Sequence, residues 1–266
     1  MKKWIDGKTI VITGASSGIG KELAKLFITK NNCRVIGVAR NKEKMEKFVA
    51  ELGESAKNFE YKLFDVSQEQ NWIDFASSLQ TSVDMLINNA GVFYKFDNFL
   101  NVPAEQGKKI MDINFYSVVY GCRSFLPITN CIVNICSSDA LLSVAGTNYY
   151  GASKCAVKGF TQSLVSEFPK KYIACILPGF TKTELFRDID FTSKEARLLN
   201  KFTSTCEKIS KKIYKSIIKK KRYKVIGYDA KIFNLLSKLN ANGGAKLVNS
   251  ILQKTKLDMF STIVKQ

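Results

Sequence analysis

The segment TIVITGASSGIG, residues 9–20, joins a short apolar stretch to a glycine-rich turn and to the start of an amphipathic pattern. Isoleucine, valine and threonine favour a β-strand, and Leu23, Leu26 and Phe27 then recur at helical spacing. Many strand–helix turns contain glycine. A glycine-rich turn after the first strand is nevertheless typical of dinucleotide-binding folds, because it lets a pyrophosphate approach the N–H groups of the helix. The segment therefore predicts a strand, a nucleotide-binding turn and a helix.

The alternation of apolar strands and helices continues along the chain. Further strands are predicted over residues 33–39, 59–66, 83–91, 131–138, 172–179 and 223–227. Helices are predicted over residues 19–30, 68–80, 103–125 and 150–168. Strands that are apolar almost throughout and separated by helices indicate a parallel sheet covered on both faces. We therefore predict a single α/β domain over residues 1–266, a Rossmann-like doubly wound parallel sheet of about seven strands.

The residue types present argue against several classes of site. The 266 residues include no histidine, so we expect no zinc site and no histidine-based triad. The seven cysteines form no C-x-x-C pair, and an odd, unpaired set suits a reducing compartment. No apolar run approaches the roughly 20 residues that span a bilayer, and the first strand begins too close to Met1 for a signal peptide. We therefore expect no metal and a cytoplasmic protein.

The chain is strongly basic, with 41 Lys and Arg residues against 23 Asp and Glu residues and a net charge of +18. Such a charge attracts polyanions, phosphorylated ligands or anionic membrane. In the most basic segment, residues 194–224, Ile209, Ile213 and Ile217 recur at helical spacing, which indicates a helix packed on the sheet with a solvated basic back. Binding of carrier-bound substrates or lipid headgroups is the alternative. No nucleic-acid motif accompanies the charge, so no nucleic-acid partner is expected.

The stretch NYYGASK, residues 148–154, contains two tyrosines and a lysine. Tyr150 and Lys154 are four residues apart, which places both side chains on one face of a helix. Four residues after Tyr149 stands Ser153, which offers no cation. An ammonium group beside a phenol stabilises the phenolate and would lower the tyrosine pKa from about 10 towards neutrality. The spacing therefore predicts Tyr150 as an acid–base catalyst and Tyr149 as a packing or pocket-wall residue.

Three motifs in this order resemble the short-chain dehydrogenase/reductase family in its short single-domain form. They are the glycine turn with the spacing Gly14-x-x-x-Gly18-x-Gly20, the stretch NNAG at residues 88–91, and the pair Tyr150 and Lys154. The resemblance extends from Lys8 to about Thr183. It implies transfer of a hydride between a nicotinamide cofactor and a carbonyl compound or secondary alcohol. A non-catalytic dinucleotide-binding sensor or interaction protein is the main alternative, and a peripheral membrane protein acting on lipids is a third.

The resemblance also implies roles for individual residues around Tyr150. Lys154 would hydrogen-bond the nicotinamide ribose. Ser137, thirteen residues before Tyr150, would hold the substrate oxygen, with the adjacent Ser138 as a competitor. Asn114, in the stretch MDINFYS, would help to hold a water molecule for proton relay. By itself, Asn114 would instead be interpreted as a capped or kinked position in a helix.

Arg40 stands where many NAD-binding relatives carry an acidic residue. A guanidinium group can pair with the 2′-phosphate of NADP(H), so we expect NADP(H) rather than NAD(H), with Lys42 or Lys44 adding charge. A solvated arginine at a strand end is the alternative. The other positions that the resemblance assigns to the cofactor are Gly14, Ser16, Ser17, Gly18, Ile19, Gly20, Asp65, Val66, Asn89, Ala90, Gly91, Tyr150, Lys154, Pro178, Gly179, Thr181 and Thr183.

Substrate recognition is expected from the C-terminal part of the chain. Residues 184–206 are polar and mixed and are predicted to form a substrate flap, and residues 229–266 a helical tail broken at residues 242–244. Four apolar side chains suggest a pocket for an apolar or carrier-bound carbonyl or alcohol, with ordinary packing as the equal alternative; they are Phe180, Leu185, Phe186 and Phe191. The resemblance implies a homodimer or homotetramer formed through the helices at about 103–125 and 150–168.

Overall fold

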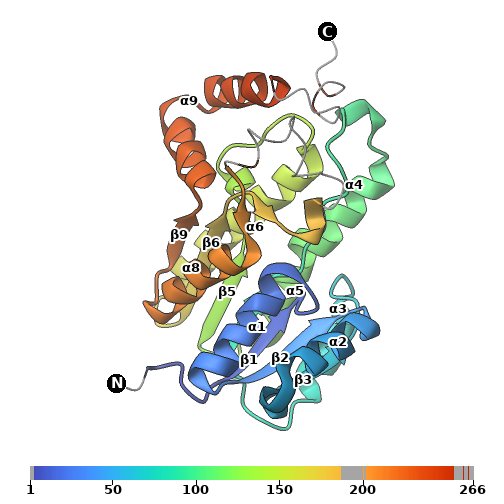
Figure 1. The fold of residues 1–266 in the computed structure, drawn as a ribbon, viewed down its shortest axis with the longest axis vertical. Coiled ribbons are helices and arrows are strands. Elements are labelled where there is room, and N and C mark those ends of the chain that lie inside the picture. The colour runs from blue at the N-terminus through green and yellow to red at the C-terminus, as the bar shows by residue number, and fades with distance from the viewer. Residues whose placement is uncertain (1–2, 187–199, 201, 255–259, 261–262, 264–266) are drawn as a thin grey trace.

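Seven parallel strands form the centre of the protein (Figure 1). The computed structural model describes residues 3–186, 200, 202–254, 260 and 263. The strand order in the main sheet is β3-β2-β1-β4-β5-β6-β9. The strands are β1 (Thr9–Thr13), β2 (Arg34–Ala39), β3 (Phe59–Leu63), β4 (Met85–Asn88), β5 (Cys131–Ile135), β6 (Tyr172–Pro178) and β9 (Tyr223–Ile226). This arrangement confirms the predicted Rossmann-like doubly wound parallel sheet.

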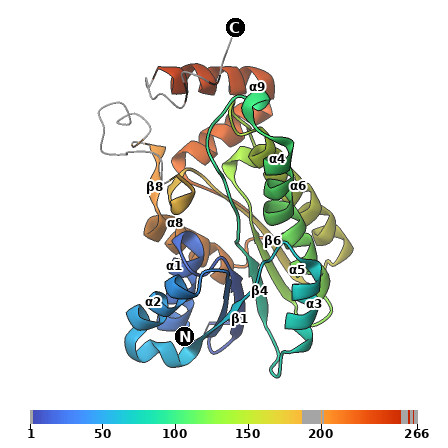
Figure 2. The same ribbon diagram turned by 90° about the vertical axis from the view of Figure 1, so that its right-hand side faces the viewer.

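Helices cover both faces of the sheet, and Figure 2 shows the two layers on either side of it. One layer consists of α1 (Gly18–Asn31), α2 (Lys42–Leu52) and α8 (Cys206–Ile218). The other consists of α3 (Glu69–Ser77), α5 (Ser117–Phe125) and α6 (Asn148–Glu167). The helix α4 (Ala104–Met111) leads into α5 through η3, a π-helical segment (Asp112–Tyr116). Because both faces are covered, the strands are apolar on both sides.

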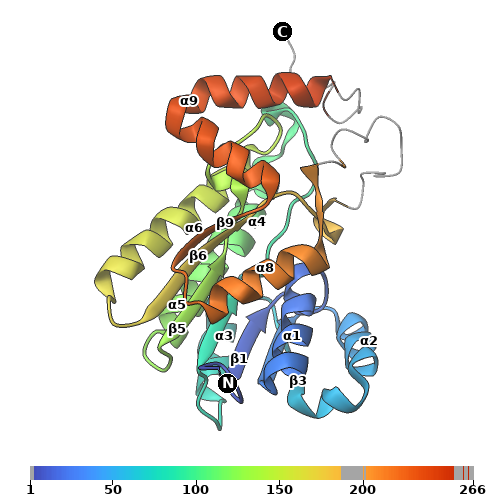
Figure 3. The ribbon, with the colours of Figure 1, turned by 60° about the vertical axis from the view of Figure 1, so that its left-hand side comes forward.

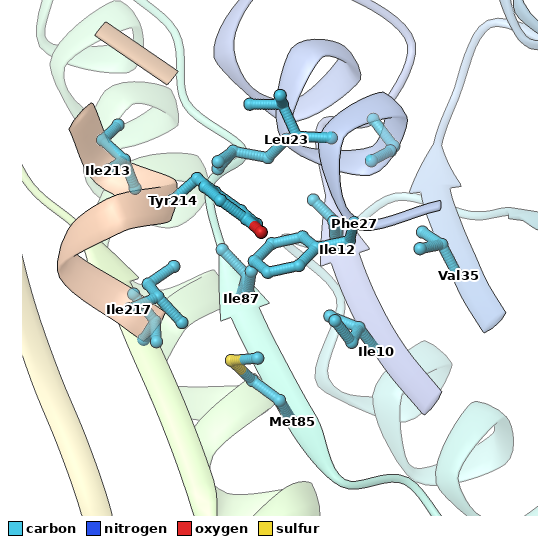
Figure 4. Packing of buried hydrophobic residues seen from close by; sticks show 14 of the residues in the cluster. Ile10, Ile12, Leu23, Phe27, Val35, Met85, Ile87, Ile213, Tyr214 and Ile217 are labelled. Carbon is cyan, nitrogen blue, oxygen red and sulfur yellow. The ribbon is translucent and has the colours of Figure 1, made fainter. Parts of the chain in front are cut away.

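The basic segment folds as its isoleucines predict. Ile209, Ile213 and Ile217 are fully buried, and α8 lies beside α1 (Figure 3), where the ring of Tyr214 lies 5.4 Å from that of Phe27. Figure 4 shows Ile213, Tyr214 and Ile217 of α8 facing side chains of β1 and β4. The lysines of α8 are exposed on its outer side; they are Lys208, Lys211, Lys212 and Lys215. The segment is therefore a packed helix with a solvated basic back.

Several strands end earlier than their apolar patterns predict. β3 ends at Leu63, β4 at Asn88 and β5 at Ile135, although the predicted segments ran to residues 66, 91 and 138. The residues beyond these ends turn into loops at the carboxyl edge of the sheet, where parallel strands place their binding residues. A second parallel pair, β7 (Thr181–Lys182) with β8 (Ser204–Thr205), was not predicted, because two polar residues carry no strand pattern.

The C-terminal part crosses the carboxyl edge of the sheet as the long helix α9 (Tyr228–Gln253). The backbone of Asn240 is extended inside it (φ −160°, ψ 101°), which places the break just before the predicted residues 242–244. A third apolar cluster lies under α9 and contains Phe96, Leu142, Val144, Phe233, Val248, Phe260 and Ile263. Among the described residues, no helix is long and apolar enough to cross a membrane. Most of the predicted flap, residues 187–199 and 201, lies outside the described residues.

Candidate active site

The sheet reverses its strand order between β1 and β4, and a cavity of about 420 Å³ opens at the carboxyl ends of the strands there. This switch point is where ligands bind in open α/β sheets. Most predicted site residues line this one cavity: Gly14, Ser17, Gly18, Ile19, Arg40, Asn89, Ala90, Gly91, Ser137, Tyr150, Lys154, Pro178, Gly179, Thr181 and Thr183. The predicted residues outside its lining are Ser16, Gly20, Asp65, Val66 and Asn114.

The glycine-rich turn forms the floor of the cavity at the start of α1. Gly14 and Gly18 adopt φ values of +65° and +55°, which side chains rarely allow. Gly20 lies behind the floor, where a Cβ atom would come within 2.3 Å of the Gly14 carbonyl oxygen. Asn89 ties the turn to the end of β4, because its side-chain amide donates to the carbonyl of Thr13 at 2.9 Å. These glycines therefore allow a close backbone approach that the predicted pyrophosphate site requires.

The start of α1 is suited to an anion. Within the described chain, the side chain of Ser17 forms no capping hydrogen bond, and no acidic residue stands in the first turn of the helix. The positive end of the helix dipole and its N–H groups are therefore available to phosphate oxygens. Across the cavity, a Cβ atom on Gly18 would lie 3.5 Å from Cγ2 of Thr183, so the groove is narrow at this point. These features fit a nicotinamide dinucleotide.

Arg40 follows β2 and lies at the open end of the cavity, with 62% of its side chain exposed. Its Nη1 atom is 3.7 Å from Oδ2 of Asp65, a long and exposed ion pair. Lys44 is held instead by Glu184, with Nζ 2.6 Å from Oε2. Lys42 pairs with Glu46 on its own helix at 3.7 Å. Of these three cations, only Arg40 lines the cavity.

Ser137 and Tyr150 meet at the far end of the cavity. Ser137 follows β5 and begins a short 3₁₀ turn, η4 (Ser138–Ala140), and its Oγ accepts the N–H of Asp139 at 3.2 Å. The proton of the Ser137 hydroxyl is not used in this contact and can be donated to the Tyr150 oxygen. Tyr150 lies in the first turn of α6 and is hydrogen-bonded to Ser137. The ring of Phe93 packs edge-on against Tyr150, with 5.3 Å between their centroids.

Lys154 lies one turn along α6 from Tyr150 and is only 5% exposed. Burial lowers the pKa of its ammonium group, and Nζ lies 5.6 Å from the centroid of the Tyr150 ring. Burial also raises the pKa of Tyr150 above its ordinary value, although the hydrogen bond with Ser137 opposes the rise. The predicted lowering of the Tyr150 pKa is therefore wrong for this structure, because desolvation of the buried phenolate outweighs the hydrogen bond from Ser137.

Asn114 lies in the π-helical segment η3 and is fully buried. Its Oδ1 accepts the N–H of Val92 at 2.7 Å, and its Nδ2 donates to the Val92 carbonyl at 2.9 Å and to Oγ of Ser153 at 3.1 Å. π-Helical segments often occur at functional sites. Here Asn114 joins the loop after β4 to α6, the helix that carries Tyr150.

Tyr149 packs outside the cavity. A Cβ atom on Gly107 of α4 would lie 2.4 Å from Cζ of Tyr149, so the ring rests directly on that glycine. The ring of Phe99 lies 5.9 Å from the Tyr149 ring. Tyr149 is thus a packing residue in this structure, and Tyr150 is the tyrosine of the pair that lines the cavity.

The sequence reasoning missed Asp139 and the aromatic residues Phe93, Tyr94 and Phe96 of the cavity wall. Asp139 is 6% exposed, and burial raises the pKa of its carboxyl group to about 7. Its only signal was an acidic residue inside the apolar stretch SSDALL. Phe93 and Phe96 line the cavity beside the predicted Phe180 and Leu185. The predicted Phe191 and the side chain of Phe186 lie outside the described part of the chain.

Comparison with known proteins agrees with this geometry. The short chain dehydrogenase family matches residues 8–194. Benzil reductase ((S)-benzoin forming) of Saccharomyces cerevisiae is 30% identical over 199 residues, which cover 69% of this chain and 75% of that protein. A serine dehydrogenase solved in its closed form with NADP+ is 26% identical, with a TM-score of 0.68 over 79% of this chain and 88% of that one.

The fold is also that of a short chain dehydrogenase/reductase from Burkholderia phymatum solved with NAD. The two chains are 22% identical, and they superpose with a TM-score of 0.76 over 90% of this chain and 96% of that one. This likeness shows the fold alone. Together with the family match over residues 8–194, these findings show that the chain belongs to the short-chain dehydrogenase/reductase family and is an oxidoreductase built on a Rossmann-like nucleotide-binding fold.

Proposed function

We propose that this oxidoreductase is an NADP(H)-dependent reductase of carbonyl compounds, with Tyr150 as the acid. One observation carries the proposal: a single cavity contains Ser137, Tyr150 and Lys154 at one end and the glycine-rich turn with Arg40 at the other. A dinucleotide that enters at Arg40 would extend along the groove towards Tyr150. Within such a site, a nicotinamide cofactor supplies the hydride, and the protein supplies placement and the proton.

The cofactor assignment depends on the cations of the cavity. The N–H groups at the start of α1 would hold the pyrophosphate, Arg40 the 2′-phosphate and Lys154 the ribose. Arg40 is suited to this role because its contact with Asp65 is long and exposed, and such pairs contribute little free energy. The serine dehydrogenase relative solved with NADP+ is consistent with it.

Proton transfer would take place at the phenol oxygen of Tyr150. Since burial raises its pKa, the phenol is protonated at neutral pH, which is the form that donates to a carbonyl oxygen. The Ser137 hydroxyl, which donates to the Tyr150 oxygen in this structure, would donate to the same carbonyl oxygen when a substrate is bound. The Nζ atom of Lys154 lies 5.6 Å from the centroid of the Tyr150 ring, and its charge would stabilise the phenolate that remains.

Asn114 is assigned a positioning role. Its amide is occupied by Val92 and Ser153, and it does not line the cavity. A part in a proton relay, as the family resemblance implied, stays a prediction. The aromatic wall formed by Phe93, Phe96 and Phe180 favours a small carbonyl or alcohol substrate with an apolar body.

The test is a comparison of Tyr150→Phe with Tyr149→Phe. Reduction of a panel of aldehydes and ketones is followed by loss of NADPH absorbance. We expect turnover by Tyr150→Phe to fall by about 10²–10⁴-fold, because the proton donor is removed, and NADPH binding to persist. Tyr149→Phe is the matched control, since it removes the same oxygen from a residue outside the cavity.

Equal turnover by Tyr150→Phe and the wild type would contradict the assignment of Tyr150. Tight NADPH binding by the wild type without turnover of any compound in the panel would favour the non-catalytic alternative.

A further inference from the structure

Asp139 is a buried carboxyl group among the residues that line the cavity. It lies in η4, two residues after Ser137, and is 6% exposed. Its Oδ2 atom is fully buried and has no hydrogen-bond partner among the described residues. A buried acceptor without a partner costs free energy, and such a group in a native protein calls for an explanation. Asp139 is also one of the residues that line the cavity containing Tyr150 and Lys154, so a small movement of its carboxyl group would let a ligand supply the missing donor.

No ion pair to Asp139 occurs in the described part of the protein, and the titratable groups that its charge influences are the Tyr150 phenol and the Cys155 thiol. The Thr147 hydroxyl and the Val144 N–H provide hydrogen bonds that favour ionisation. Burial opposes ionisation more strongly and raises the pKa of the Asp139 carboxyl group to about 7. This carboxyl group could therefore accept a hydrogen bond from a donor in the cavity.

Local geometry makes room for this carboxyl group beside the reacting atoms. A Cβ atom on Gly151 would lie 2.7 Å from Oδ2 of Asp139, so only glycine leaves the carboxyl group its place. Gly151 lies in the first turns of α6, and the positive end of the helix dipole there favours a negative charge. The main chain of Asp139 meanwhile donates to Oγ of Ser137 at 3.2 Å. The main chain of Asp139 is thus in contact with the hydroxyl that would hold the substrate oxygen.

We propose that Asp139 is a specificity-determining residue, which accepts a hydrogen bond from a hydroxyl or ammonium group that the substrate carries close to its reacting carbonyl carbon. This assignment rests on the carbonyl reduction proposed above. The substrate class is therefore an α-hydroxy ketone or α-amino ketone with an apolar remainder. The opposite wall suits that remainder, because the rings of Phe93 and Phe96 lie 4.8 Å apart and those of Phe96 and Phe180 stack at 6.2 Å.

The experiment uses three ketones that differ only at the α-carbon beside the carbonyl: acetophenone, α-hydroxyacetophenone and α-aminoacetophenone. The kcat/KM for reduction with NADPH is measured for the wild type, Asp139→Ala and Asp139→Asn. Within each variant, the kcat/KM of each substituted ketone is divided by that of acetophenone, which removes general effects of the substitution on activity. Glu184→Gln is the matched control, because Glu184 is a carboxylate on the same cavity that is already paired with Lys44.

We expect the wild-type ratio for the substituted ketones to exceed that of Asp139→Ala by about tenfold or more, the effect of one hydrogen bond. Asp139→Asn separates the two donors, because its amide oxygen accepts from a hydroxyl but carries no charge for an ammonium group. It should retain the preference for the hydroxy ketone and lose that for the amino ketone. Glu184→Gln should retain both preferences. Ratios that are the same in the wild type and in Asp139→Ala would overturn the proposal.

A binding measurement separates this proposal from the carbonyl reduction on which it rests. The same ketones are titrated by calorimetry into the wild type and Asp139→Ala, each saturated with NADPH. If the wild type reduces none of the ketones, the proposed reduction fails for this class. The role of Asp139 still stands if the wild type binds the substituted ketones more tightly than Asp139→Ala does. It falls if the two proteins bind them alike.

Discussion

Arg40 is the residue on which the choice between the two nicotinamide cofactors depends. Its guanidinium group lines the cavity and is largely exposed, and its only ion pair in the described structure is the 3.7 Å contact with Asp65. A 2′-phosphate would offer it a shorter and doubly charged partner. Asp65 itself accepts from the N–H and hydroxyl of Ser67, so it is held at the end of β3 whether or not Arg40 stays beside it.

Arg40→Ala should therefore weaken NADPH binding and leave NADH binding nearly unchanged. A charged hydrogen bond contributes about 1.5–3 kcal/mol, so we expect a loss of about 10–100-fold in NADPH affinity. The measurement is a fluorescence titration with both cofactors side by side. Lys42→Ala is the control, since Lys42 is an exposed cation paired with Glu46 and not part of the cavity. Tighter binding of NADH than of NADPH by the wild type would refute the role of Arg40.

At the scale of elements, Asp229 connects the start of α9 to the loop after β6. Its Oδ2 accepts the N–H of Phe180 at 2.6 Å, and Oδ1 lies where Cβ atoms on Gly179 and Gly227 would clash with it. Oδ1 has no hydrogen-bond partner among the described residues. Burial therefore raises the pKa of this carboxyl group to about 6. Because Phe180 lines the cavity, this contact also fixes part of the cavity wall.

The raised pKa of Asp229 makes stability depend on pH. The folded protein keeps the proton up to a pH of about 6, whereas an unfolded chain releases it near 3.8. The contribution of this group to stability is therefore fully present below the lower value and is lost as the pH rises through the higher one. Asp229→Asn carries no charge, so relative to it the wild type should lose up to about 3 kcal/mol between pH 4 and pH 7.

Denaturant unfolding of the wild type and Asp229→Asn at several pH values measures this change. An equal difference in unfolding free energy at all pH values would show that Asp229 titrates in the folded protein as it does in the unfolded chain. Asp74→Asn is a suitable reference, since Asp74 is exposed on α3 and its carboxylate accepts from Gln70 of the same helix.

At the scale of the whole molecule, an aromatic patch on the helical layer opposite α8 is only partly buried. The ring of Phe115 lies 5.2 Å from that of Tyr116 and 6.1 Å from that of Phe160 on α6, and Tyr116 stacks on Tyr120 at 6.1 Å. Tyr116 is 43% exposed. The patch lies on the helices through which the family resemblance implied a homodimer or homotetramer.

We expect the protein to be a dimer or tetramer that assembles through this patch. Tyr116→Glu should shift the mass found by light scattering to that of one chain, because it places a charge in an apolar interface. Leu100→Glu changes a side chain that is 89% exposed on η2 (Phe99–Asn101) and serves as the control. A wild-type protein that already runs as a single chain at micromolar concentration would contradict the prediction.

The sequence by itself determined the sheet, its covering helices and most of the residues at the cavity. Local periodicity suffices for such features, because an apolar strand or an isoleucine stripe such as that of α8 has one way to be buried. The glycine turn and the pair Tyr150 and Lys154 could be found because their roles depend on spacing along a single turn or helix.

The electrostatics of the site and the composition of its wall could be seen only in the folded structure. Burial depends on segments far apart in the chain, so neither the raised pKa of Tyr150 nor the unpaired carboxyl group of Asp139 follows from local pattern. The same holds for the contact between Asp229 and Phe180, which joins residues 49 positions apart. The physical reason is that desolvation and pairing are properties of the folded environment, whereas spacing and propensity belong to the chain.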